Sequence, residues 1–137
     1  MTRDLPGVAH DAPAHVSGPH EAYLALLAEG VLGFQACGSC ACVVFPPRGR
    51  CSGCGADALM WRASAGRGAV YSTTALSPRD KPPYAIVLID LDEGYRMMSR
   101  IEGVDAEATR IDDRVSVRFT PAGEDVLPLF VPDRGDR

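Results

Sequence analysis

Two Cys-x-x-Cys pairs constrain the fold of this chain more than any other feature. The first pair is Cys37 and Cys40, and the second, Cys51 and Cys54, follows after a linker of ten residues. Glycines in both turns allow backbone amides to point at the thiolates, and ten residues suffice for two short strands. Four soft thiolates in a closed tetrahedral shell suit zinc and build a structural site. We therefore predict a rubredoxin-like zinc ribbon in which these four cysteines hold the ion.

The same sulfurs could serve other purposes. A redox Cys-x-x-Cys would normally occur once, at the start of a helix after a strand. Disulfides need an oxidising compartment, whereas the chain has five cysteines and no apolar signal segment at its N-terminus, which favours the cytoplasm. Iron would use the same four ligands, and the sequence does not separate it from zinc. The fifth cysteine, Cys42, lies in an apolar run and is interpreted as a small buried hydrophobe instead of a fifth ligand.

Composition limits the classes of partner. The chain has 137 residues, of which 46% are hydrophobic, as expected for one domain of ordinary size with a small attachment. No stretch is long and apolar enough to cross a membrane. The net charge of -4 argues against a nucleic-acid surface, because neutralising phosphates requires an excess of basic groups. We therefore expect neither a membrane nor a nucleic acid as partner.

The N-terminal residues predict a flexible segment. Residues 1–18 are rich in Pro, Ala, Gly and His and have no periodicity. His10, His15 and His20 recur every five residues, a spacing that suits ligand pairing on neither a helix nor a strand. We interpret all three as solvated side chains.

Residues 19–33 predict a helix that begins near a proline after a Ser-Gly cap. Tyr23, Leu26 and Leu27 give this short helix a broad apolar face. The face could pack on the chain's own core, or it could dock on another protein, since a lone helix ahead of a ribbon has little core to cover. We keep both interpretations and treat these three residues as candidates for partner docking.

The remainder predicts a mainly β architecture, with a zinc ribbon at residues 34–58, a barrel at 59–132 and a tail at 133–137. Glycines inside the first barrel strand indicate a bulge or a sharp coil. Five strands at short spacing favour a closed five-stranded OB-fold barrel. The expected strand segments cover residues 59–76, 84–91, 95–101 and 114–119, and the proline-broken segment 126–132 fits an edge strand or a peptide lying in a groove.

The order of these parts resembles a known family. After the helix come Cys37-x-x-Cys40, then Phe45-Pro46-Pro47-Arg48-x-x-Cys51-x-x-Cys54, Trp61, and the strand Ser64-x-Gly66-x-Gly68-x-Val70-x-Ser72. This arrangement is similar to the zinc-ribbon plus OB-fold family of acyl-CoA-associated proteins, long catalogued as domain of unknown function thirty-five. Asp113 departs from the family pattern, which often has glycine before the last strand.

The resemblance implies a non-catalytic partner of thiolase-fold enzymes. Such enzymes make or break carbon–carbon bonds in acyl-CoA thioesters, and they include thiolases and the aldolases of steroid side-chain and aromatic degradation. The barrel is expected to help hold the CoA thioester as a shared ligand, and the ribbon and helix to dock the catalytic subunit in a heterotetramer or a larger complex.

The residues fit this accessory role better than a catalytic one. Zinc held by four thiolates has no open position for water. All three histidines precede Glu21, so a Ser-His or Cys-His nucleophile pair is not expected. Contact with CoA would rely on arginines, because a guanidinium group binds phosphate bidentately. The candidates for CoA binding or the interface are Arg48, Arg50 and Arg67, which could equally be solvated or bridge to acidic groups of the partner.

Two other functions stay open at this point. A single-stranded nucleic-acid-binding module would need aromatic side chains on an exposed basic sheet face, and a rubredoxin-like electron carrier would need iron. The acyl group, and whether the partner condenses, cleaves or transfers, are not encoded in any pattern that we recognise.

Overall fold

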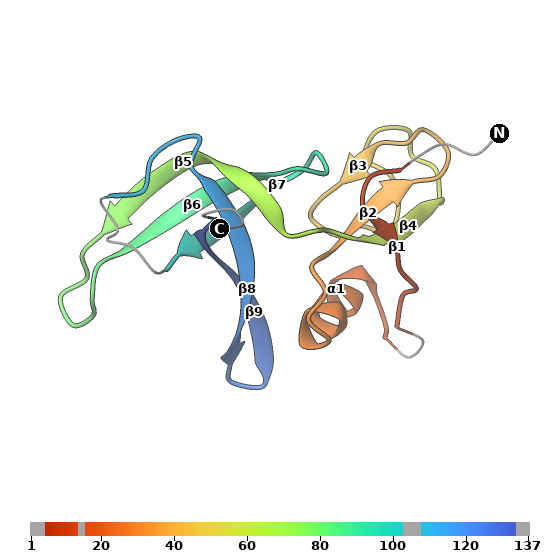
Figure 1. Ribbon diagram of the computed structural model, residues 1–137. Helices are drawn as coiled ribbons and strands as arrows, with labels where there is room; N and C mark the ends of the chain where they lie inside the picture. The colour runs from red at the N-terminus through yellow and green to blue at the C-terminus, as the bar shows by residue number, and fades with distance from the viewer. Residues whose placement is uncertain (1–4, 14–15, 103–107, 134–137) are drawn as a thin grey trace.

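A four-stranded antiparallel sheet forms the ribbon, in the order β1-β4-β2-β3 (Figure 1). This computed structural model describes residues 5–13, 16–102 and 108–133. The strands are β1 (Val8–Ala9), β2 (Gly33–Cys37), β3 (Val43–Val44) and β4 (Leu59–Ala63). β2 is the centre of this sheet, since it pairs with β3 on one side and along its whole length with β4 on the other.

Two strands of this sheet differ from the sequence-based expectation. Leu59–Ala63 was placed at the start of the barrel, but β4 pairs with β2 from Gly33↔Ala63 to Cys37↔Leu59 and belongs to the ribbon sheet. Val8–Ala9 lies in the segment expected to be without regular structure, yet it pairs with the outer edge of β4. The linker between the cysteine pairs holds one two-residue strand, β3, where two strands were expected.

The helix of the described residues, α1 (Pro19–Ala28), starts at the predicted proline and follows Gly18 as N-cap. Gly30 ends it in a left-handed conformation with φ +79, which glycine adopts without a steric penalty.

The apolar face of α1 points into the chain's own core. Tyr23, Leu26 and Leu27 retain only 9%, 0% and 2% of their exposure. α1 contacts β2 and the last barrel strand, and Figure 1 shows it beneath the ribbon next to the β8–β9 hairpin. Of the two interpretations of this face, the burial of the three side chains favours packing on the chain's own core.

Five strands close into a barrel with the order β5-β6-β7-β9-β8, and β8 returns to pair with β5. Their bounds are β5 (Arg67–Leu76), β6 (Tyr84–Leu91), β7 (Arg96–Ile101), β8 (Arg114–Ala122) and β9 (Asp125–Pro132). All pairs are antiparallel except β7 with β9. The closed five-stranded barrel confirms the predicted mainly β, OB-fold architecture.

The first barrel strand is coiled as its glycines predicted. Gly66 has φ +75, and a Cβ there would collide with Cγ1 of Val117 on β8. A Cβ at Gly68 would collide with the carbonyl oxygen of Asp90 on β6. The register between β5 and β6 then shifts between Val70 and Ser72. The glycines thus let β5 approach both neighbours closely enough to close the barrel.

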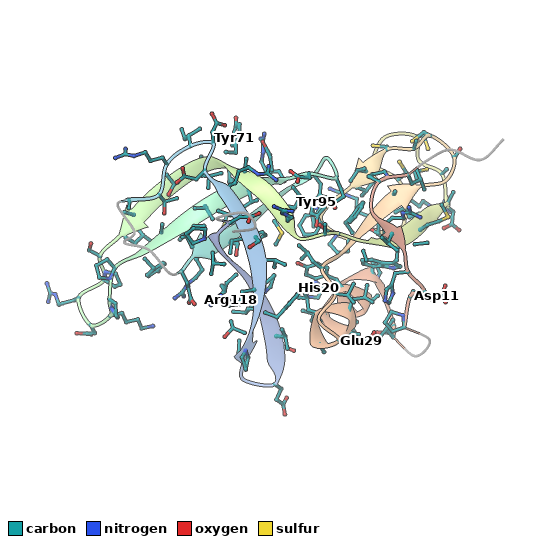
Figure 2. All side chains as sticks on the ribbon, in the orientation of Figure 1. Asp11, His20, Glu29, Tyr71, Tyr95 and Arg118 are labelled. Carbon is teal, nitrogen blue, oxygen red and sulfur yellow. The ribbon has the colours of Figure 1, made fainter. Side chains whose placement is uncertain are left out.

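The ribbon and the barrel share one hydrophobic core. Tyr95, which follows the β6–β7 turn, stacks on Phe34 of β2 with ring centroids 5.0 Å apart, and it lies 5.0 Å from the ring of Phe45. The same cluster joins Leu27 of α1 to Phe130 of β9. Figure 2 shows Tyr95 at the junction of the two units.

Among the described residues, no helix has the length and apolar character needed to span a membrane.

Candidate metal centre and its surroundings

The four predicted cysteines converge on one point. Their Sγ atoms all lie within 4.8 Å of one another. The Sγ atoms of Cys37 and Cys54 are 3.7 Å apart, and those of Cys40 and Cys51 are 3.6 Å apart. A tetrahedron of zinc–sulfur bonds of about 2.3 Å has sulfur–sulfur edges of about 3.8 Å, whereas a disulfide requires about 2.05 Å. The donor set and its spacing therefore fit a structural zinc ion in a closed shell of four thiolates.

Backbone amides point at the sulfurs in both turns. The N–H of Ser39 donates to Sγ of Cys37 at 3.4 Å, and the N–H of Gly53 donates to Sγ of Cys51 at 3.3 Å. The two turns therefore present the first cysteine of each pair in the same way, as the glycine-bearing turns predicted.

These amides also favour the charged form of the first cysteine. The pKa of the Cys51 thiol is lowered to about 6, first by the backbone N–H of Cys54 and further by that of Gly53. The pKa of Cys37 is lowered in the same manner, first by the backbone N–H of Cys40. Because the thiolate is the form that binds metal, the first cysteine of each turn is prepared for a cation.

Cys42 lies outside the set of four. Its side chain is half-buried next to Gly53, and its thiol donates weakly to the carbonyl of Val43 at 3.6 Å. Burial, the largest cause, raises the pKa of this thiol, in contrast to Cys37 and Cys51. The geometry is that of a small packing residue beside the metal centre.

A buried glutamine that the sequence analysis missed holds the linker between the two turns. Gln35 is 4% exposed, and its amide donates to the carbonyl of Arg48 at 2.8 Å and accepts from the N–H of Arg48 at 2.7 Å. The only signal for this role in the sequence was a polar residue within a short apolar strand. The backbone groups of Arg48 that Gln35 bonds cannot be recognised from sequence.

The three candidate arginines lie in two different places. Arg48 and Arg50 are exposed in the linker before the second cysteine pair, and a guanidinium N–H of Arg50 donates to the carbonyl of Gly55 at 3.3 Å. Arg67 begins β5, and its guanidinium is engaged at 2.8 Å by Asp133. Arg48 and Arg50 therefore form one candidate surface, which Arg67 does not share.

The tyrosines and histidines bear on the alternative functions. Tyr71 is 48% exposed; the guanidinium of Arg96 lies 3.4 Å from its ring centroid, and Asp90 holds that guanidinium at 2.6 Å. The exposed ring thus carries an ion-paired arginine and does not belong to a free basic face. His20 is exposed and His10 is partly exposed, while His15 lies outside the described residues.

Comparison with protein families identifies both parts of the chain. Residues 24–59 match the rubredoxin-like zinc ribbon domain of ChsH2, and residues 61–120 match the ChsH2 C-terminal OB-fold domain. The boundary between the two matches falls within β4.

Two curated proteins are similar in sequence. A probable enoyl-CoA hydratase alpha subunit from Thermomonospora curvata is 29% identical over 103 residues, which make up 72% of this chain but only 32% of that protein. A DUF35 domain-containing scaffold protein from Methanothermobacter thermautotrophicus is 27% identical over 95 residues, covering 65% of this chain and 71% of that protein. The chain therefore spans about a third of the length of the first relative.

Two solved structures have similar folds. A chain of the Ltp2-ChsH2(DUF35) aldolase superposes with a TM-score of 0.77 at 26% identity, covering 88% of this chain and 98% of that one. A DUF35-family protein of unknown function from Sulfolobus solfataricus gives a TM-score of 0.62 at 16% identity, with 82% and 84% covered. The second likeness shows a shared fold alone.

Proposed function

This chain belongs to the ChsH2 family of proteins that join a rubredoxin-like zinc ribbon to an OB-fold domain, and we propose that it is an auxiliary, non-catalytic subunit of a thiolase-like acyl-CoA enzyme. In this role it stabilises the catalytic subunit and helps to bind the CoA thioester.

One observation carries the proposal. The aldolase chain that superposes on this protein is covered over 98% of its length, so the two share the ribbon, the helix and the barrel together. That chain belongs to a structure named for two proteins, Ltp2 and ChsH2(DUF35). The names of the curated relatives, a subunit of an acyl-CoA enzyme and a scaffold protein, support the same kind of role.

The site chemistry agrees with an accessory role. Zinc, held by Cys37, Cys40, Cys51 and Cys54, would supply a cross-link between the two turns in place of a hydrophobic core. The cysteines, their amides and Gln35 then hold a rigid loop that presents Arg48 to the outside. We place Arg48 and Arg50 at the interface with the catalytic subunit or the CoA phosphates.

Co-expression tests the subunit role. The chain is produced together with a thiolase-type acyl-CoA subunit of the source organism, and turnover of acyl-CoA is measured for the chain, the catalytic subunit and the mixture. We expect the chain alone to be inactive and the mixture to exceed the catalytic subunit alone. Absence of co-purification, together with no effect on solubility or turnover, would contradict the proposal.

A double substitution tests the arginine surface. Arg48→Ala with Arg50→Ala should weaken assembly or raise KM for the CoA thioester, because the double substitution removes two positive charges from an exposed loop. Arg118→Ala, at an exposed position on the barrel strand β8, is the matched control and should change neither quantity. Unchanged assembly and unchanged turnover in the double variant would remove these arginines from the interface.

A further inference from the structure

Two adjoining hollows lie on the barrel at β6 and β7. One is an apolar groove of about 450 Å³, and the other is a basic hollow of about 690 Å³ beside the loop of residues 77–83 that joins β5 to β6. Tyr84 and Arg100 line both, so the two hollows adjoin. An OB-fold barrel binds ligands on its second and third strands and on the loop between its first two strands. In this chain those parts are β6, β7 and residues 77–83, so the hollows lie where the fold holds ligands.

The basic hollow contains more cations than carboxylates. Its charged lining residues are Arg79, Lys81 and Arg100 against Asp80 and Glu102, in a chain whose net charge is -4. Arg79 and Lys81 are exposed and form no ion pair with the described residues, whereas Arg100 lies 3.8 Å from the carboxylate of Glu102. Two cations of the loop therefore keep their N–H donors for an anion, and phosphate is the anion that such groups bind best.

Three prolines stiffen the loop that presents these two cations. Pro78, Pro82 and Pro83 all lie within residues 77–83. Proline fixes φ at about -65°, so a loop this rich in proline has few conformations to lose when a ligand binds. Arg79 and Lys81 are thus held ready for an anion at a small cost in conformational entropy.

The adjoining groove exposes large apolar side chains. Met98 of β7 is 68% exposed, Leu127 of β9 is 47% exposed, and Ile86 adds to the lining from β6. Ile86 pairs with Arg100 across the β6–β7 ladder, so the apolar lining begins next to a cation of the basic hollow. An apolar group that covers these side chains removes them from water, which is favourable.

The lining favours a hydrocarbon chain over nucleic-acid bases. Bases stack on exposed aromatic rings, whereas Met98, Leu127 and Ile86 are aliphatic. The ring of Tyr84 already has the guanidinium of Arg100 at 4.7 Å from its centroid. Three cations are also few for a polyanion. The charges and the apolar lining together match a small molecule that has phosphates at one end and a hydrocarbon chain at the other.

We propose that the two hollows bind an acyl-CoA thioester, with its phosphates beside Arg79 and Lys81 and an apolar acyl chain in the groove at Met98. The inference rests on the proposed function and deepens it, because it gives the thioester a site on the barrel and favours a long apolar acyl group over a short one. Arg48 and Arg50 then serve the contact with the catalytic subunit. The exposed lining leaves the groove open to solvent, so that subunit can reach a thioester bound there.

Titration calorimetry of the zinc-loaded full chain tests this site, with coenzyme A and decanoyl-CoA as probes. We expect decanoyl-CoA to bind about tenfold more tightly than coenzyme A, because its hydrocarbon chain leaves water. Arg79→Ala with Lys81→Ala should raise the Kd of both probes about tenfold, since two charge-assisted contacts are lost. Met98→Gln with Leu127→Gln should abolish the advantage of decanoyl-CoA and leave the Kd of coenzyme A unchanged, while Met98→Leu should preserve both values.

Two positions outside the hollows provide matched controls. Arg118 and Ile111 are both exposed, Ile111 by 63%, and neither lines the groove or the basic hollow. Arg118→Ala and Ile111→Gln should therefore keep the Kd of each probe within about twofold of wild type. All variants should retain the wild-type zinc content and melting temperature.

The outcomes separate this site from the subunit role. Decanoyl-CoA that binds no more tightly than coenzyme A, or equally tightly to the Met98→Gln, Leu127→Gln chain, overturns the assignment of the groove. Absence of binding at about 1 mM probe overturns the whole site, as does displacement of decanoyl-CoA by an equal concentration of a single-stranded oligonucleotide. These results leave the co-expression test untouched. A chain that binds decanoyl-CoA but neither co-purifies with a thiolase-type subunit nor alters its turnover overturns the subunit role and retains the site.

Discussion

At the scale of single residues, the two metal-binding turns differ at one matched position. The N–H of Ala41 donates to the carbonyl of Cys37 at 2.8 Å, and the N–H of Gly55 donates to the carbonyl of Cys51 at 2.9 Å. Both residues follow the second cysteine of their pair and have positive φ, 66 for Ala41 and 78 for Gly55. The first turn thus holds an alanine in a conformation that favours glycine.

Ala41→Gly should therefore stabilise the zinc-loaded protein by about 0.5–1 kcal/mol, because relief of left-handed strain exceeds the greater entropy of glycine in the unfolded chain. Gly55→Ala should destabilise it by about 1 kcal/mol for the reverse reason. Denaturant unfolding of both variants checks this pair. A destabilised Ala41→Gly would show that the alanine side chain contributes packing that outweighs its strain.

The fifth cysteine gives a matched control for the ligands. Cys54→Ser should lose stoichiometric zinc, because the hydroxyl is a poor replacement for the fourth thiolate and Cys54 is exposed enough to change without a packing defect. Cys42→Ala should retain it, since Cys42 lies outside the set of four. Metal analysis of the purified variants decides the point, and zinc loss from Cys42→Ala would make this thiol part of the site.

At the scale of elements, a carboxylate joins the connection between β4 and β5 to the β6–β7 turn. Glu93 accepts from the hydroxyl of Ser64 at 2.6 Å and from the N–H of Ala65 at 2.9 Å. Nothing local in the sequence identifies these partners, which lie almost thirty residues away along the chain. Glu93 thus ties the only covalent link between the ribbon and the barrel to the barrel itself.

Glu93→Ala should lower the free energy of unfolding by about 1–3 kcal/mol, because two hydrogen bonds to a charged acceptor are lost. Glu124→Ala, in the exposed β8–β9 turn, is the control and should have an effect within about 0.5 kcal/mol. Urea unfolding of both variants provides the comparison. Equal small effects would mean that water replaces the Glu93 contacts without loss.

The individual strands were predictable to different degrees. The existence of β6 follows directly from its continuous apolar run, and the cysteine spacing determines the metal turns through local geometry alone. Whether β4 belongs to the ribbon sheet or to the barrel was not predictable, because its sequence pattern suits either sheet. Only its pairing with β2 decides between them. β9 contains two prolines and still forms a full strand, since β8 pairs with it from Val115↔Pro132 to Ala122↔Asp125.

At the scale of the whole molecule, the position of the ribbon on the barrel depends on aromatic packing. Phe34, Phe45 and Tyr95 come from distant parts of the sequence and meet in one cluster. No periodicity in any one segment signals this meeting, so the sequence predicted the two units but not their junction. The burial of the apolar face of α1 is a consequence of the same junction.

Metal removal should therefore affect both units. A chelator should change the fluorescence of Trp61, the single tryptophan, because β4 lies beside the metal turns in the ribbon sheet. It should also speed hydrogen exchange around Tyr95 in the barrel, since the shared core loses the ribbon's aromatic rings. A change in fluorescence with unaltered barrel exchange would show that the two units are energetically independent.

We propose that the zinc-ordered ribbon and its barrel together form a binding platform for a catalytic acyl-CoA subunit. Native mass spectrometry of the chain co-expressed with a thiolase-type subunit of the source organism tests this most directly. We expect one species that contains both polypeptides with one zinc ion per copy of this chain, and its dissociation after chelation. A catalytic subunit at its own mass beside a free chain, or a complex that persists after the metal is removed, would contradict it.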